Sequence, residues 1–151
     1  MALRLTVNTQ SDIDETQIII NCNHMDDKLS MLIGLIKQFA YVFRAKSETG
    51  ACLVPAEDVY YIESVDSKTF LYCEKDVYCV SDTLQEIENE LADSAFVRIS
   101  KSCIVNLSYL DTVRPFWNHR LEARLKNSER LIVTRSYIDS LRKKLNSGRE
   151  T

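Results

Sequence analysis

The stretch FVRISKSCIVNLSYLDTVRPFW, residues 96–117, decides how the rest of the chain is interpreted. It contains the cations Arg98, Lys101 and Arg114, with Arg120 just beyond its end, and apolar residues surround them. Short runs of valine, isoleucine and tyrosine that are broken by polar turns are typical of β-strands. The pattern therefore predicts short strands with basic residues near their turns, in a chain whose net charge is −3.

That net charge conceals a strong asymmetry. Residues 1–95 carry 7 Lys/Arg and 17 Asp/Glu, a net charge of −10, whereas residues 96–151 carry 12 and 5, a net charge of +7. A basic segment of this kind can bind a polyanion such as nucleic acid. The asymmetry also fits two halves that neutralise each other across the fold, so charge alone leaves both interpretations open.

Length and composition predict one domain with a small appendage, because the chain has 151 residues, 45% of them hydrophobic, and few glycines and prolines. No run of about 18 apolar residues and no signal peptide is present, so a cytoplasmic protein is expected. The five cysteines are odd in number and form no CxxC pair, which predicts free thiols. Cys103, beside the basic turn, is expected to be a buried inert thiol rather than a redox sensor. His24 and His119 have no cysteine at ligand spacing, so no metal site is expected.

The first 44 residues predict a strand-strand-helix module. LRLTVN and QIIINCN have the pattern of two strands joined by a polar turn. The segment NHMDDKLSMLIGLIKQFAYVF then predicts an amphipathic helix capped at Asn23, with Leu32, Ile36 and Phe39 in its apolar stripe. Gly34 can allow close packing. Since a two-stranded ribbon with one helix has a thin core, the module is expected to pack on the rest of the chain or on a second copy.

Residues 45–147 predict a mainly β domain with two small helices. Val- and Tyr-rich strands alternate with turns, and SDTLQEIENELA forms a short helix capped by Ser81 or Asp82. In RLEARL, alternation places Leu121, Ala123 and Leu125 on one side of a strand and Glu122 and Arg124 on the other. The terminal SYIDSLRKKL helix turns Tyr137, Ile138, Leu141 and Leu145 inward. No helix-turn-helix pair is present.

Catalytic motifs are missing from the sequence. It contains no nucleophile elbow, no phosphate loop and no dinucleotide-binding glycine pattern, since its three glycines are scattered. We therefore expect no enzyme, no cofactor and no small-molecule substrate.

Three predicted loops carry polar or basic side chains at strand ends. Lys68 and Thr69 lie on the turn of VDSKTF, and Lys101 lies between Ser100 and Ser102 in the turn after FVRI. Arg135 and Ser136 begin the last helix. Lysine and arginine on loops can reach phosphates or guanine edges in a major groove. Each cation alone fits a solvated surface charge, but three such loops together indicate a function.

The pieces VPAEDVYYIES, SDTLQEIENEL, FVRISKSCIVNLSYLDTV and RLIVTRSYIDSLRKKL resemble the LytTR DNA-binding domain, in the same order, over about residues 52–145. The resemblance implies a LytTR-type fold of about ten short antiparallel strands in small sheets with two short helices. It also implies a bacterial transcription regulator that inserts loops into successive major grooves of imperfect direct repeats. The base-reading positions of the family fall on Lys68, Thr69, Lys101 and Arg135. Many members have His or Asn at the first two positions, so Thr69 and Lys101 depart from the pattern.

Further residues are candidates for contacts with DNA phosphates. Arg98 can alternatively pair internally with a carboxylate, and Ser102 and Ser136 can alternatively cap turns. Asn106 is expected to satisfy backbone groups in a turn. The phosphate candidates are Arg98, Ser100, Ser102, Arg114, Arg120, Ser136 and Lys143.

The whole chain is similar to the small stand-alone LytTR regulators, which lack a phosphorylated receiver domain. The resemblance implies double-stranded DNA and a small integral-membrane regulatory protein as partners. Residues 1–44 would dimerise or take the regulatory signal, and a homodimer fits repeated half-sites. The alternative is a protein-interaction module that keeps the fold and binds a regulatory protein partner through its acidic N-terminal part.

Overall fold

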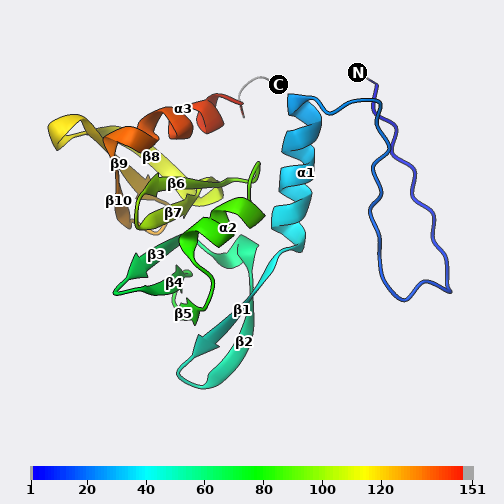
Figure 1. Cartoon of the computed structure of the whole chain (residues 1–151), viewed down its shortest axis with the longest axis horizontal. Coiled ribbons are helices and arrows are strands. Elements are labelled where there is room, and N and C mark those ends of the chain that lie inside the picture. The colour runs from blue at the N-terminus through cyan, green and yellow to red at the C-terminus, as the bar shows by residue number, and fades with distance from the viewer. Residues whose placement is uncertain (1, 148–151) are drawn as a thin grey trace.

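The computed structural model describes residues 2–147 and contains ten strands in two antiparallel sheets, with three α-helices (Figure 1). The mainly β class predicted from the sequence is confirmed. The strands are β1 (Val42–Ser47), β2 (Gly50–Pro55), β3 (Tyr61–Val65), β4 (Lys68–Tyr72), β5 (Val77–Val80), β6 (Phe96–Ser100), β7 (Cys103–Asn106), β8 (Leu110–Phe116), β9 (Arg120–Leu125) and β10 (Arg130–Val133).

The larger sheet has seven strands in the order β2-β1-β5-β4-β3-β7-β6, and the smaller sheet has the order β10-β9-β8. The β1–β2 ribbon joins the larger sheet through a single pairing, between Lys46 and Cys79. The ribbon therefore projects from the sheet as a hairpin, which Figure 1 shows at its lower edge.

Strands in the middle of the larger sheet are buried on both faces. On β3, Tyr61 and Ile62 are 8% and 0% exposed and belong to two different hydrophobic clusters. Helix α2 (Leu84–Glu90) contributes to the first cluster, whereas the smaller sheet and α3 (Ile138–Ser147) contribute to the second. Alternating side chains thus fill two cores, which fixes the register of the central strands.

Helices α2 and α3 lie where the sequence predicts them. Thr83 caps α2, and a capping box joins its hydroxyl and backbone to Glu86. The predicted caps Ser81 and Asp82 were therefore wrong by one or two residues. Helix α3 buries Leu141 and packs Ile138 and Leu145 against the second core, as predicted, and Tyr137 just before the helix packs there too.

Helix α1 (Asp27–Ala40) is anchored through small and polar side chains. Asp26, not the predicted Asn23, caps it by accepting from the Leu29 amide at 2.8 Å. A Cβ atom on Gly34 would lie 1.8 Å from the carbonyl oxygen of Asp93, so the helix approaches that backbone closely, as predicted. Gln38 Oε1 accepts from the Ala95 amide at 2.8 Å. The predicted apolar stripe is only partly covered, since Leu29 is 4% exposed but Leu32 and Phe39 are 37% and 78% exposed. Leu35, outside that stripe, is 55% exposed.

Residues 2–26 contain no helix or strand, so the two strands predicted for LRLTVN and QIIINCN were wrong. Leu5, Val7 and Ile19 are 83%, 78% and 74% exposed, and no sheet or helix covers them. Alternation of apolar residues favours a strand only when a partner face buries them, and an isolated two-stranded hairpin is marginal in water. Figure 1 shows this segment as a long loop beside α1. We call residues 2–26 the N-terminal arm.

Candidate nucleic-acid interface

The three loops that carry the predicted site residues meet at one edge of the molecule. The Ser64 amide, near the end of β3, donates to the Ser102 carbonyl at 2.8 Å. The Thr134 amide, after β10, donates to the Ile99 carbonyl at 3.0 Å. These hydrogen bonds join the β3–β4 turn, the β6–β7 turn and the start of the 3-10 helix η4 (Arg135–Tyr137). Figure 1 shows all three along its left side.

The β3–β4 turn exposes Lys68 but not Thr69. Asp66 and Ser67 both have positive φ, at 50° and 65°, which is the conformation of a tight two-residue hairpin turn. Lys68 opens β4 and is exposed. Thr69 is only 5% exposed because it lies between Ser64 of β3 and Val80 of β5. Of the two residues predicted here, Lys68 is therefore the one that can reach a DNA groove in this conformation.

Hydrogen bonds from the Arg98 side chain hold the β6–β7 turn. In Arg98, Nε donates to the Ser100 carbonyl at 2.8 Å, Nη2 donates to the Lys101 carbonyl, and Nη1 pairs with Glu88 Oε2 of α2 at 2.9 Å. The Arg98 side chain is 15% exposed. The sequence left open a phosphate contact or an internal ion pair, and the structure shows the internal pair. The guanidinium fixes the turn, whose Lys101 and Ser102 side chains are exposed.

The third loop places Arg135 and Ser136 on the surface between two anchored elements. Val133 and Leu141, which precede and follow them, are 0% and 1% exposed. The residues of η4 begin directly after Thr134, whose backbone is bonded to β6. An exposed arginine on a fixed short loop can present its planar donors to a guanine base.

The β8–β9 hairpin carries the candidate phosphate contacts Arg114 and Arg120. Arg114 Nη2 lies 2.7 Å from Glu122 Oε1, and Arg130 Nε lies 3.9 Å from the same oxygen. Glu122 was expected on the exposed side of β9, yet it is 6% exposed because these two arginines cover it. The Arg114 side chain remains 60% exposed.

Lys143 and Lys144 of α3 differ in their surroundings. Lys143 is exposed. Lys144 Nζ donates to the carbonyls of Ser94 and Phe96 at 2.7 and 2.6 Å. Burial lowers the pKa of Lys144, while Asp93 and Glu88 act in the opposite direction. Lys143 is therefore the member of this pair that can contact a phosphate.

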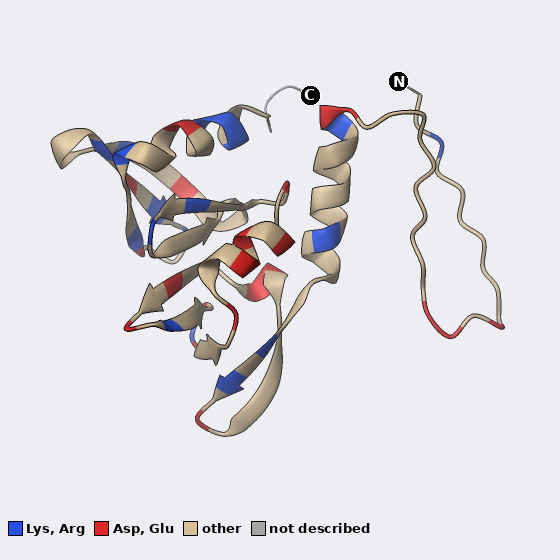
Figure 2. Ribbon diagram, viewed as in Figure 1, with Lys and Arg blue, Asp and Glu red and all other residues tan. Residues whose placement is uncertain are grey.

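The charges of the acidic part, residues 1–95, and of the basic part, residues 96–151, are not neutralised mainly by direct ion pairs. Within residues 2–147, the three ion pairs are Arg98–Glu88, Arg114–Glu122 and Arg130–Glu122, and one of them joins the acidic part to the basic part. Figure 2 shows red, acidic positions gathered on α2, whereas blue, basic positions outnumber the red ones on the smaller sheet and α3. Exposed cations such as Lys101 and Arg135 belong to none of these pairs. This arrangement favours a polyanion as the partner of the basic part.

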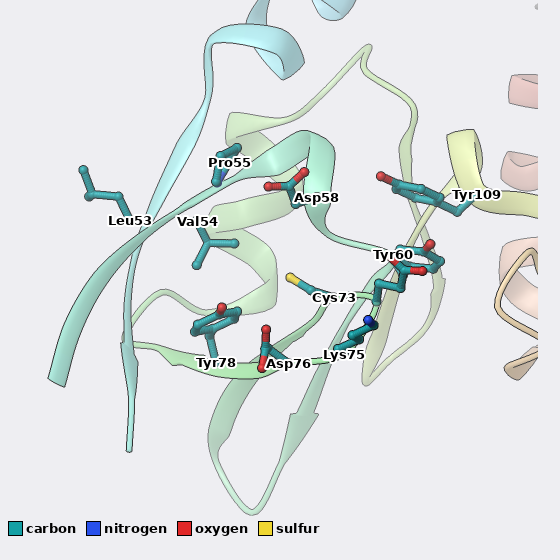
Figure 3. Close-up of a pocket in the computed structure, with 11 residues that line it drawn as sticks. Leu53, Val54, Pro55, Asp58, Tyr60, Cys73, Lys75, Asp76, Tyr78 and Tyr109 are labelled. Atoms are coloured by element: carbon teal, nitrogen blue, oxygen red, sulfur yellow. The ribbon is translucent and has the colours of Figure 1, made fainter. Parts of the chain in front are cut away.

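A pocket of about 330 Å³ lies away from these loops, between β2 and the β4–β5 connection. Figure 3 shows Cys73 pointing into it, with Asp58 and Asp76 on either side. Burial, then these two carboxylates, raises the pKa of Cys73 to about 11. A thiol that stays protonated beside carboxylates is a poor nucleophile and a poor anion site. The pocket therefore adds no chemistry to the basic edge.

Two further findings concern the described residues as a whole. No group of three or more His, Cys, Asp or Glu side chains within residues 2–147 is placed to hold a metal ion. Among the helices of the same residues, none has the length and apolar character needed to cross a bilayer.

Comparison with known proteins places these features in a family. The model of the LytTr DNA-binding domain family matches residues 49–146. A solved structure, the LytTr DNA-binding domain of a putative methyl-accepting/DNA response regulator from Bacillus cereus, is similar with a TM-score of 0.65 and 32% identity, over 69% of this chain and 95% of that one. The fold and the three converging loops thus define a LytTR-type DNA-binding domain.

The chain belongs to the LytTR DNA-binding domain family, as its sequence motifs predicted. It is 32% identical to the sensory transduction protein LytT of Bacillus subtilis over 93 residues, which are 62% of this chain and 39% of that protein. It is 30% identical to the transcriptional regulatory protein YpdB of Escherichia coli over 91 residues, which are 60% of this chain and 37% of that protein. The chain thus matches about two-fifths of the length of these relatives. This membership supports a DNA-binding transcription regulator.

Sequence reasoning missed two features of the site. It did not find the two hydrogen bonds that Arg98 donates to the turn carbonyls, although an arginine two residues before the β6–β7 turn was a signal for them. It also placed Glu122 on the surface, because period-two alternation cannot show that two arginines on neighbouring strands will cover a carboxylate.

Proposed function

We propose that this chain is a sequence-specific bacterial transcription regulator that reads imperfect direct repeats in the major groove through its loops. The observation that carries the proposal is the convergence of Lys68, Lys101 and Arg135 on three turns that backbone hydrogen bonds hold together. Loop cations held at one edge can contact one face of a duplex together, whereas scattered surface cations cannot.

Each residue has a distinct role in this proposal. Arg135 forms the bidentate contact with guanine O6 and N7, because its guanidinium matches that pair of acceptors. Lys101 and Lys68 read neighbouring positions, and Thr69 supports Lys68 from within the sheet. Polar and basic side chains around them bind phosphates and set the register. These are Ser100, Ser102, Arg114, Arg120, Ser136 and Lys143.

In this proposal the N-terminal arm and α1 carry the regulatory function. The proposal requires no phosphorylated receiver domain. Leu35 and Phe39 on α1 and the apolar residues of the arm are exposed, so these segments have surface to bury against a partner. A second copy of the chain fits repeated half-sites. A small integral-membrane protein that restrains the regulator would use the same surface.

The test is fluorescence anisotropy on labelled DNA from upstream of this protein's own gene, across a series of salt concentrations. Wild type should bind this DNA specifically, and affinity should fall steeply between about 50 and 200 mM salt. Arg135→Ala should lose about tenfold or more in specific affinity, since a good bidentate contact contributes about 1–3 kcal/mol. Arg44→Ala is the matched control, because Arg44 is also an exposed arginine but lies on β1.

Weak, sequence-blind binding that Arg135→Ala leaves unchanged would contradict the proposal. A protein-interaction module would then be the better interpretation, and its affinity for a protein partner through an apolar surface should barely respond to salt.

A further inference from the structure

The tip of the β8–β9 hairpin presents the single tryptophan of the chain to solvent. Trp117 is 76% exposed. It begins the short 3-10 helix η3 (Trp117–His119), in which Asn118 and His119 have φ values of 55° and 59°. Two successive residues in the left-handed region make a sharp reversal, so the indole stands at the extremity of the hairpin.

The base of the tip is held by its neighbours. Arg120 Nε donates to the Trp117 carbonyl at 3.0 Å, and the Arg120 guanidinium lies 5.3 Å from the centroid of the Phe116 ring. Below it, the Arg114–Glu122 ion pair spans the two strands. The backbone that carries Trp117 is therefore fixed, although no side chain covers the indole.

The tip lies at the same end of the smaller sheet as the third reading loop. Leu121, which follows the tip, pairs with Val133, two residues before Arg135. Thr134 in turn is bonded to Ile99, which precedes the β6–β7 turn. Figure 1 shows the yellow hairpin projecting beyond the edge where the three reading turns lie.

A single exposed apolar residue is common and implies nothing by itself, so its position and its charged neighbours decide the argument. Trp117 is next to the proposed groove-reading edge, and Arg114, His119 and Arg120 flank it. Proteins that bind the minor groove frequently combine arginine or lysine contacts with apolar side chains that insert at base steps, while other cations face phosphates. This combination fits the DNA that adjoins the base pairs read by Arg135.

We propose that Trp117 docks against the minor groove of the same duplex, immediately outside the base pairs that Arg135 reads. This inference rests on the proposed function, since it requires the three loops to hold the duplex. In this inference the β8–β9 hairpin adds a contact with DNA outside the major groove. Base pairs that flank the repeat should therefore contribute to affinity.

The experiment uses the fluorescence of Trp117, which is the only tryptophan present. Unlabelled operator DNA is added to the full-length protein, and emission and quenching by acrylamide are recorded while anisotropy of labelled DNA follows binding in parallel. Docking should change the emission and lower the quenching constant about twofold or more, because a neutral quencher loses access to a covered ring. Emission and quenching that stay unchanged while anisotropy shows specific binding would overturn the inference and leave the proposed function intact.

A second measurement tests where the ring lies on DNA. Trp117→Ala should weaken specific binding about threefold to tenfold on a duplex that extends past the repeat, which corresponds to about 1 kcal/mol or slightly more. On a duplex trimmed to the repeat the same substitution should have almost no effect, since two changes that remove one contact are not additive. Val77→Ala is the control, because Val77 is also an exposed apolar residue, 52% exposed on β5. Equal losses on both duplexes would overturn the inference, and absence of specific binding by wild type would instead contradict the proposed function.

Discussion

In the proposed function, Arg98 serves DNA reading without contacting DNA. Its guanidinium bonds the carbonyls of Ser100 and Lys101 on one side and the carboxylate of Glu88 on the other. A lysine lacks the planar fork of donors with which Arg98 reaches two carbonyls and a carboxylate at once. We therefore assign Arg98 to the positioning of Lys101 and not to the neutralisation of a phosphate.

Arg98→Lys should accordingly lower specific affinity about tenfold while leaving the dependence of affinity on salt unchanged. Anisotropy on specific and unrelated DNA across salt concentrations measures both quantities. Glu88→Gln should have a smaller effect, since it removes the ion pair but leaves the carbonyl contacts. If Arg98 instead bound a phosphate, the substitution would weaken binding to all sequences alike and reduce the salt slope by about one.

Cysteine reactivity should follow burial. Burial, opposed only by Arg98, raises the pKa of Cys103 to about 12, and Glu63 adds to the increase. Because the thiolate is the nucleophile, Cys103 and Cys73 should remain unreactive toward iodoacetamide near pH 8, and their rates should rise only as the pH approaches their raised pKa values. Cys22 in the N-terminal arm is exposed and should react first.

Mass spectrometry of the labelled peptides over time checks this order, and unfolding in urea should make all five cysteines reactive. Rapid labelling of native Cys103 near pH 8 would contradict the inert role and reopen the redox interpretation.

At the scale of elements, the docking of α1 depends on Gly34, which has no side chain. A methyl group on Gly34 would collide with the Asp93 carbonyl, and this backbone cannot move away as a flexible side chain would. Alanine normally favours a helix over glycine by about 1 kcal/mol, but the collision should outweigh that gain.

Gly34→Ala should thus reduce the free energy of unfolding by about 1–3 kcal/mol, measured by urea denaturation followed by circular dichroism. Lys37→Ala on the exposed side of the same helix should change it by less than about 0.5 kcal/mol. A stabilised Gly34→Ala variant would show that α1 does not pack closely on the 92–95 loop.

Most elements of the LytTR domain could be predicted because their signals are local. Alternation in RLEARL and the period of SYIDSLRKKL predicted the buried apolar residues of β9 and α3 correctly, although not the burial of Glu122. The N-terminal arm failed because alternation reports a possible strand but not the partner that would bury it. For α1, the apolar period predicted the helix. The buried residues of its docking face are Leu29, Gly34 and Gln38, so a polar residue that periodicity cannot identify takes part, while Phe39 of the apolar stripe stays exposed. Thr69 fits the turn pattern in sequence, yet its burial depends on β5, which lies eight residues away or more.

At the scale of the whole molecule, the proposed reading edge and α1 lie on opposite sides. Figure 1 shows the reading turns on the left, and α1 and the N-terminal arm on the right. A partner that covers α1 would therefore leave the loops free for DNA. Two copies joined through α1 could each read one repeat, which is the geometry that a homodimer on repeated half-sites requires.

This proposed dimer predicts that a charge on the exposed face of α1 dissociates it. Leu35 and Phe39 are one helical turn apart and are 55% and 78% exposed in the single chain. The double substitution Leu35→Glu and Phe39→Glu places two like charges where the two copies would meet, at little cost to the fold of one chain. Light scattering at micromolar protein should give a dimer for wild type and a monomer for the variant. Val77→Glu, which charges an exposed apolar residue on β5, should remain a dimer.

The same variants connect assembly to DNA reading. A monomeric variant with intact loops should bind a single repeat as wild type does, because Lys68, Lys101 and Arg135 are unchanged. On DNA with two repeats it should lose the gain in affinity that comes from linking two binding events, which is often about a hundredfold. Wild type that is monomeric at micromolar concentration would contradict the dimer and leave α1 and the N-terminal arm as the surface for a different protein. In that outcome the double variant should bind two repeats as tightly as wild type, since no linkage exists to be lost.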